Sequence, residues 1–189
     1  LFLQRGISEA TLRLFKAGMA HANKLNKRIC FPVYDRKGRI IGFAGRWFKE
    51  EVPFESVKKW KLIGQKKTWL FPNHLNEDII RAAREVIIVE SVGDLLAVWE
   101  AGYQNVMCIF GTDMSPKQLS YVIGLDPNRI IIATNNDTRN NAGQVAAGKM
   151  LKKMSEHFQN DQILIHLPTK NDFGEMNSTE IRDWYAQIS

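Results

Sequence analysis

The chain has 189 residues, of which 44% are hydrophobic, enough for one large domain or two small ones with a packed core. The composition excludes a disordered chain, no stretch approaches the roughly 20 apolar residues that span a bilayer, and no signal-peptide pattern is present. The net charge of +6 is uneven: residues 1–84 carry 18 Lys and Arg against 7 Asp and Glu, whereas residues 85–189 carry 8 against 13. The basic half suits a polyanion and the acidic half suits a metal ion.

The first portion of the chain, residues 1–74, is predicted to form a small basic subdomain of mixed α/β structure. It opens with a helix that has Ser8 as its N-cap and carries Phe15 and Met19 on one face. Gly18 lies late in this helix and is expected to mark its end.

Two strand-like runs follow at residues 28–34 and 39–48, joined by a turn in which Gly38 can adopt a positive φ. Pro32 lacks an N–H donor, so the first of these strands is predicted to be an edge strand or to be bulged. Shorter strands are expected at residues 58–63 and 68–71.

Helices and strands alternate in the remainder of the chain, residues 75–189. This alternation is typical of a parallel sheet with helices on both faces. We therefore expect an α/β fold in which the basic subdomain precedes an open parallel sheet. Helices are predicted at residues 76–84, 94–101, 115–123, 142–157 and 178–188, and strands at residues 86–90, 106–110, 130–134 and 162–167.

Acidic residues follow the ends of several predicted strands. Glu90 ends an apolar strand, and Asp94 follows it by four residues. Asp137 and Asp172 come after two later strands, with Glu175 close behind. Open α/β sheets bind their ligands at the C-terminal ends of parallel strands. A single acid there is most simply a solvated loop residue, but three strand ends beside a basic subdomain favour a site for a hard divalent cation, and so phosphate chemistry.

The order of the motifs permits a closer comparison. Glu90, Asp94 and a segment ending at Asp137, followed by AGQ, resemble the Toprim domain of bacterial primases, topoisomerases and some nucleases. Four further segments resemble DnaG-type primases in the same order: FLQRGISEATLRLFKAGMA, RICFPVYDRKGRIIGFAGRWF, KKWKLIGQKKTWLFPNHLN and AGYQNVMCIFGTDMSPKQLSYV. The resemblance covers residues 1–175 and favours a primase over a Toprim nuclease, which would have no need of the upstream segments.

Three positions depart from the family pattern. Ser91 replaces the Gly of a Glu-Gly pair, a change that we expect the fold to tolerate. Asn135 replaces the first Asp of an Asp-x-Asp motif; it offers a carbonyl oxygen without a charge and should weaken Mg²⁺ binding. The segment KNDF at residues 170–173 replaces a Lys-Asp-Pro-Asp element and looks more like phage and plasmid primases, which makes Asp172 the fourth carboxylate.

The resemblance implies roles for these acidic residues. It assigns catalysis to Glu90, Asp94 and Asp137. It also implies a Mg²⁺ or Mn²⁺ site formed by Glu90, Asn135, Asp137 and Asp172, with Glu175 assisting Asp172.

The basic residues of the first portion are interleaved with three tryptophans. Cations beside aromatic rings suit a single-stranded template, although the same pattern also fits a charged surface over a tryptophan-containing core. By resemblance, Arg46, Lys59 and Lys61 are the residues expected to contact template or nucleotide.

Two functions are consistent with these patterns. The first is the core of a Mg²⁺-dependent DNA primase, a DNA-directed RNA polymerase that joins ribonucleoside triphosphates into short primers on single-stranded DNA. The alternative is a primase-like domain that binds single-stranded DNA but is catalytically weak or inactive because of Asn135.

The resemblance also implies a cellular setting. We expect a cytoplasmic protein of a bacterial cell, of phage or plasmid type, that contacts a replicative helicase through a region outside this chain and has no membrane partner. The chain begins at Leu1 rather than Met, so we expect a fragment whose zinc-binding module lies elsewhere. Cys30 and Cys108 lie in apolar runs without a CxxC pair and are predicted to be reduced, buried thiols.

Overall fold

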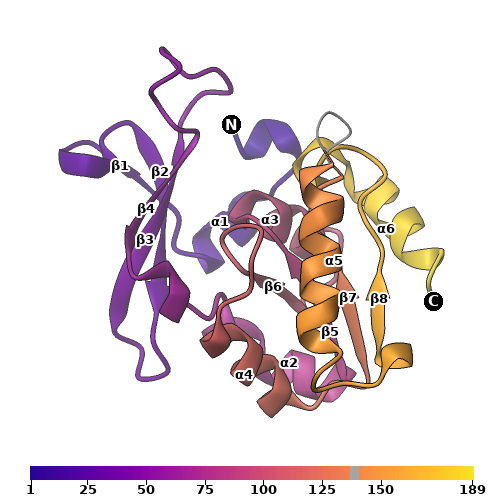
Figure 1. The fold of residues 1–189 in the computed structure, drawn as a ribbon. Helices are drawn as coiled ribbons and strands as arrows, with labels where there is room; N and C mark the ends of the chain where they lie inside the picture. The colour runs from indigo at the N-terminus through magenta and orange to yellow at the C-terminus, as the bar shows by residue number, and fades with distance from the viewer. Residues whose placement is uncertain (137–140) are drawn as a thin grey trace.

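The computed structural model describes residues 1–136 and 141–189. Two four-stranded sheets lie side by side, an antiparallel sheet from the first part of the chain and a parallel sheet from the second (Figure 1). Short 3-10 helices are labelled η. The first part comprises η1 (Leu3–Arg5), α1 (Glu9–Leu14), β1 (Gly18–Ala20), η2 (Asn23–Leu25), β2 (Arg28–Tyr34), β3 (Ile40–Trp47), β4 (Trp60–Gly64) and η3 (Lys66–Thr68).

The antiparallel sheet has the strand order β1-β2-β3-β4. The predicted turn between β2 and β3 is confirmed, because Gly38 has a φ of +74°. One carboxylate oxygen of Asp35 accepts hydrogen bonds from the backbone N–H groups of Lys37 and Arg39, each at 2.9 Å. The turn is therefore held by its own side chain.

Pro32 has the surroundings that its missing donor predicts. It lies beyond Cys30, the last residue of β2 that pairs with β1. The pairing of β2 with β3 shifts register between Val33 and Tyr34, next to the proline. At Pro32, β2 is therefore open on its β1 side and irregular close by.

The first helix is shorter than predicted. Ser8 does cap it, accepting a hydrogen bond from the N–H of Thr11 at 3.1 Å. However, Lys16 has a φ of +52°, and Met19 lies in β1 rather than in the helix. Pairing with β2 outweighs the helical spacing of the apolar residues here, because a local propensity is worth little against tertiary packing.

The strand predicted at residues 68–71 is also wrong. Thr68 belongs to η3, and Phe71 forms only an isolated bridge with Cys108. Trp69 and Phe71 are completely or almost completely buried. This apolar run therefore packs between the two sheets and is not a strand of either.

The second part of the chain forms the predicted parallel sheet, with the strand order β6-β5-β7-β8. Helices α3 and α6 cover one face, and α2, α4 and α5 cover the other. The predicted α/β fold is confirmed, with element ends displaced by a few residues. The elements are α2 (Asn73–Ala83), β5 (Glu85–Val89), α3 (Val92–Glu100), β6 (Val106–Cys108), α4 (Pro116–Leu125), β7 (Arg129–Ile132), α5 (Ala142–Met154), η4 (Asn160–Gln162), β8 (Ile163–Ile165), η5 (Phe173–Glu175) and α6 (Ser178–Ala186).

One buried cluster joins the two parts of the chain. Phe31 and Trp69 of the first part belong to the same apolar cluster as Leu95 of α3. The division into residues 1–74 and 75–189 stays a prediction, because this shared core does not separate the two parts. Both cysteines are free and buried, as predicted. Within the described ranges, no helix has the length and apolar character needed to cross a membrane.

Candidate functional site

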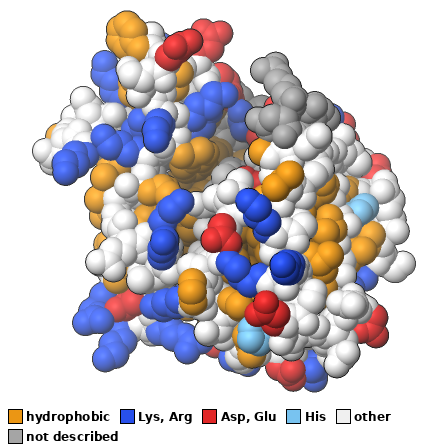
Figure 2. All heavy atoms as spheres, viewed as in Figure 1, with side chains coloured by type: hydrophobic (Ala, Val, Ile, Leu, Met, Phe, Trp, Pro, Cys, Tyr) orange, Lys and Arg blue, Asp and Glu red, His pale blue; other side chains and the backbone are white. Residues whose placement is uncertain are grey.

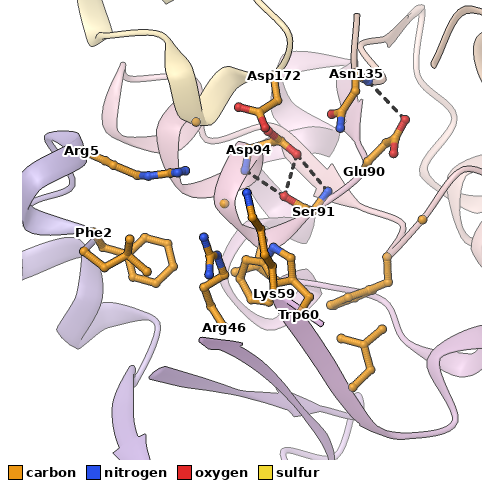
Figure 3. Close-up of a pocket in the computed structure, with 17 residues that line it drawn as sticks. Phe2, Arg5, Arg46, Lys59, Trp60, Glu90, Ser91, Asp94, Asn135 and Asp172 are labelled. Atoms are coloured by element: carbon orange, nitrogen blue, oxygen red, sulfur yellow. Dashed lines mark hydrogen bonds between the residues drawn. The ribbon is translucent and has the colours of Figure 1, made fainter. Parts of the chain in front are cut away.

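The ends of β5 and β7 bring two predicted site residues together. The two strands pair in parallel, so the residues that follow them emerge at the same edge of the sheet. Glu90 follows β5, and Asn135 lies three residues beyond β7. The backbone N–H of Asn135 donates a hydrogen bond to Oε1 of Glu90 at 3.2 Å (Figure 3). The carboxylate of Glu90 is therefore tied to the chain that leaves β7.

Asp94 lies in the first turn of α3 and is only 2% exposed. It forms a capping box with Ser91: its Oδ2 accepts from the Ser91 hydroxyl at 2.6 Å and from the Ser91 N–H at 3.1 Å. Burial, and then the negative charges of Asp172 and Glu90, raise the pKa of Asp94 to about 7, while the hydrogen bonds from Ser91 oppose the shift. Ser91 thus both starts α3 and orients the Asp94 carboxylate.

Asp172 reaches the same edge through a loop. The side chain of Asn136 donates to the carbonyl of Pro168 at 3.0 Å, and its backbone N–H donates to the carbonyl of Asn171 at 2.8 Å. These bonds fasten the segment after β8 to the segment after β7. Asp172 then caps η5 by accepting from the N–H of Glu175 at 3.0 Å. A third strand end therefore contributes a carboxylate.

The start of α5 lies directly against this edge. A side chain at Gly143 would overlap the carbonyl of Asn135. The carbonyl of Gly143 also accepts a hydrogen bond from the hydroxyl of Thr134 at 3.0 Å. The glycine of the AGQ segment is therefore needed for close packing that holds Asn135 in place.

Cations from the first part of the chain face these acids across a cavity of about 350 Å³. In Figure 3, Arg5, Arg46 and Lys59 lie on one side of the space and the acidic side chains and Asn135 on the other. Figure 2 shows a hollow between the two parts of the molecule with Lys and Arg side chains along its border. The cavity thus presents positive and negative groups on opposite walls.

The two arginines are held by the chain itself. Arg5 makes two hydrogen bonds to Glu50, at 2.8 and 2.7 Å, and this carboxylate is the main cause of a raised pKa of Arg5. Arg46 is 4% exposed and donates to the carbonyls of Trp47 and Lys49. Burial, reinforced by the charge of Arg5, lowers the pKa of Arg46.

Lys59 differs from the two arginines in that it is exposed. Among the described residues it makes no ion pair. It is therefore the cation that can most readily move to meet a ligand.

Most of the predicted site residues that are described meet in this cavity, and two do not. Glu90, Asp94, Asn135, Asp172, Arg46 and Lys59 all line it. Lys61 is exposed and does not, because its neighbours Trp60 and Leu62 face the cavity and side chains alternate along a strand. Glu175 is also outside the cavity lining, and Asp137 lies outside the described residues.

Two residues were missed by the sequence reasoning. Arg5 lines the cavity, and its signal was present in the RG pair of the first primase-like segment. Asn136 fastens the Asp172 segment, but nothing in its sequence context separates it from an ordinary loop asparagine.

The residues present fit a hard divalent cation by chemistry. Carboxylate and amide oxygens are the donors that Mg²⁺ and Mn²⁺ prefer, and crowded negative charge is what raises the pKa of Asp94 beyond the effect of burial. Among the described residues, no three His, Cys, Asp or Glu side chains are arranged closely enough to hold an ion by themselves. The fit therefore rests on donor type and charge.

Two family models match the chain in succession. The N-terminal domain of the DNA primase catalytic core matches residues 2–73, and the Toprim domain matches residues 84–163. The two matches follow the order of the two sheets.

Curated relatives of the chain are DNA primases. The DNA primase of Helicobacter pylori is 28% identical over 126 residues, which are 67% of this chain and 22% of that protein. The DNA primase of Legionella pneumophila is 26% identical over 169 residues, 88% of this chain and 29% of the relative. The chain thus spans about a quarter of the length of these relatives.

Solved structures share the fold. The RNA polymerase domain of Mycobacterium tuberculosis primase DnaG has a TM-score of 0.79 at 17% identity, covering 98% of this chain and 74% of that one. A DnaG primase catalytic domain bound to single-stranded DNA has a TM-score of 0.75 at 18% identity, covering 98% and 69%. With both family models in order and the fold of the catalytic core, the chain belongs to the family of DnaG-type DNA primases and corresponds to their catalytic core.

Proposed function

We propose that the chain is the RNA-polymerising core of a DNA primase, which joins ribonucleoside triphosphates into short RNA primers on single-stranded DNA during replication. One observation carries the proposal: side-chain oxygens from three strand ends, three carboxylates and one amide, line the same cavity as cations from the first part of the chain. The relative whose catalytic domain is bound to single-stranded DNA supports the choice of template.

The roles of the residues follow from their positions. Glu90, Asn135 and Asp172 would hold Mg²⁺ or Mn²⁺, together with Asp137, which lies outside the described residues. Such an ion, when bound, would favour the ionised 3′-hydroxyl and neutralise the triphosphate. Asp94 would complete the site as a catalytic carboxylate, oriented by Ser91.

The cationic wall would bind the phosphates. Arg5 and Arg46 are held in fixed orientations by Glu50 and by backbone carbonyls, so they lose little conformational entropy when they meet a triphosphate. Lys59 is exposed at the mouth and suits a template or nucleotide phosphate. Lys61 stays a candidate only for template that extends over the outer face of the sheet.

Asn135 motivates the second candidate function, a domain that binds single-stranded DNA with weak or no catalysis. Its amide replaces a charge at the position next to Glu90. Loss of one carboxylate among few lowers the affinity for Mg²⁺ more than the affinity of the cationic wall for DNA.

Ribonucleotide incorporation on a single-stranded template decides between the two functions. The chain, Asn135→Asp and Glu90→Gln would be assayed across Mg²⁺ and Mn²⁺ concentrations, with template binding measured in parallel. We expect primers from the wild-type chain, a lower metal requirement for Asn135→Asp, and loss of product for Glu90→Gln with DNA binding retained.

Other outcomes separate the alternatives. Product from Asn135→Asp alone would identify a primase fold inactivated at one position. No product from the wild type or from Asn135→Asp, even with Mn²⁺ and with DNA bound, would overturn the enzyme proposal in favour of the binding domain.

The proposed setting is the cytoplasm of a bacterial cell. A phage or plasmid origin is supported by Asp172-Phe173 after the last strand. Contact with a replicative helicase would use regions of the longer relatives that this chain does not span.

A further inference from the structure

A second cavity lies apart from the candidate active site. It has a volume of about 520 Å³ and shares no lining residue with the first cavity. Its walls are the β2–β3 turn, the start of α2 and one side of α4, and it is called the hairpin pocket below. Figure 1 places these elements at the lower end of the molecule. A volume of this size is typical of small-molecule sites.

The lining of the hairpin pocket is strongly positive. Among the described residues, it contains five basic side chains and a single acid, Asp35, which is already paired with Arg39 at 2.7 Å. Neither Lys37 nor Lys117 makes an ion pair among the described residues, and both are exposed. Figure 2 shows Lys and Arg side chains gathered at this lower end. The basic residues are Arg36, Lys37, Arg39, Arg81 and Lys117.

The nearest additional acid does not cancel this charge. Glu77 lies at 3.4 Å from Arg36 and at 3.2 Å from Arg81, so one carboxylate is shared by two guanidinium groups. With Arg39 matched by Asp35 and Glu77 divided between the two arginines, the lysines have no counter-charge in the described structure.

Asn73 provides an independent sign of a missing ligand. It lines the pocket, is only 7% exposed, and its side-chain oxygen has no hydrogen-bond partner among the described residues. It is the first residue of α2, an 11-residue helix that has no side-chain cap. The positive end of this helix dipole and an unsatisfied amide therefore meet at the same wall.

The remaining wall is aromatic and apolar. Tyr34, Ile41, Leu70 and Tyr121 line it, and the guanidinium of Arg36 lies 5.4 Å from the centre of the Tyr121 ring. A ligand with both a phosphate and a flat ring matches this combination, since cations bind the one and an aromatic or apolar wall the other.

We propose that the hairpin pocket is a second phosphate-binding site, which takes a nucleotide by its phosphates on Lys37 and Lys117 and by its base against the Tyr34 side. The nucleotide can be a free nucleoside triphosphate or one unit of a nucleic acid strand. This site lies beyond the proposed catalytic cavity and does not depend on it.

The test is an NMR titration of the whole 189-residue chain in EDTA, with ATP in one series and a dT oligonucleotide in the other. The amides of Gly38 and Gly124 report on the hairpin pocket, and those of Ser91 and Gly111 report on the other cavity. The variant K37Q/K117Q removes the unpaired charges. The matched control K149Q/K152Q removes two exposed lysines of α5 that line neither cavity.

We expect the amide resonances of Gly38 and Gly124 to shift on addition of at least one ligand. The K37Q/K117Q substitutions should raise the Kd for that ligand by roughly fivefold or more. The control variant should bind as the wild type does. Shifts with ATP alone identify a free nucleotide, and shifts with the oligonucleotide alone identify a strand.

The proposal is overturned if neither ligand moves the amides of the hairpin pocket. It is equally overturned if K37Q/K117Q, with an unchanged spectrum elsewhere, binds both ligands as tightly as the control. The amide resonances report on each cavity separately. A negative result for the hairpin pocket therefore does not bear on the proposed primase activity.

Discussion

Asp94 has two roles, because it caps the start of α3 and also lines the cavity. It closes the capping box of α3 with Ser91, and it lies within the field of Asp172 and Glu90. Its ordinary role at a helix start is that of an ionised carboxylate, which favours the helix dipole. Burial among like charges opposes ionisation, so the same residue stabilises the fold best when it is protonated.

This conflict predicts how stability depends on pH in the metal-free protein. The pKa of Asp94 is about 7 in the folded chain, above roughly 3.9 in an unfolded one. The folded state therefore holds the proton more tightly, and the free energy of unfolding should fall as pH rises from about 4 to about 7, by at most roughly 4 kcal/mol. Urea unfolding in EDTA at pH 5 and pH 8 measures most of this fall.

Asp94→Asn is the matched variant for that measurement. It has no charge to bury, so its stability should change less between pH 5 and pH 8 than that of the wild type. An equal fall in both proteins would mean that other groups cause the dependence.

At the scale of elements, Trp69 packs the first sheet against the second. Its ring is fully buried and lies 4.8 Å from the ring of Phe110, which follows β6. On its other side the ring covers Gly42 of β3, where a side chain would overlap it. Packing of Trp69 against β3 therefore requires a residue without a side chain at position 42.

Gly42→Ala should therefore lower the free energy of unfolding by about 1–3 kcal/mol, because the indole ring or β3 must move. Gly18→Ala is the control, since a side chain there would meet nothing within 4 Å. We expect the control to change stability by less than about 0.5 kcal/mol in the same urea unfolding experiment. Equal stability of the two variants would show that the contact with Trp69 adapts without cost.

The elements that could be predicted from the sequence are those in which the pattern of apolar residues matches the packing in the structure. The alternation after residue 75 was sufficient because each parallel strand contains a run of apolar residues and several helices follow a clear start, such as Ser115-Pro116. Residues 68–71 and the segment around Met19 were mispredicted for the opposite reason. A short apolar run can form an irregular buried segment, a strand or one face of a helix, and the residues that pack against it in the structure determine which of these it forms.

At the scale of the whole molecule, the charge asymmetry of the sequence becomes two walls of one cavity. Arg5, Arg46 and Lys59 come from the basic part, whereas Glu90 and Asp172 come from the acidic part. A polyanion entering the cavity is held by one wall, and the opposite wall is too negative to hold it without a cation.

Template binding should accordingly depend on salt. The logarithm of the affinity for a dT oligonucleotide should fall linearly with the logarithm of KCl concentration, and Lys59→Gln should reduce the slope by about 0.7, the value for one lost phosphate contact on a single strand. Fluorescence anisotropy measures both quantities. Lys152→Gln, an exposed lysine of α5, is the control and should keep the wild-type slope. A slope that Lys59→Gln does not change would remove Lys59 from the template path.

The sequence by itself determined which residues could do the chemistry. Acids at strand ends and the family-like order of motifs pointed to Glu90, Asp94 and Asp172, because strand ends of a parallel sheet converge wherever the chain has this alternation. The tertiary structure decided which cations face them. Trp60 and Leu62 of β4 line the cavity and Lys61 between them does not, since neighbouring side chains of a strand point to opposite faces. Lys59 lines the cavity from just before β4, and which face of the strand meets the cavity depends on how the sheet docks. Arg5 joined the site for the same reason, through packing between segments distant in sequence.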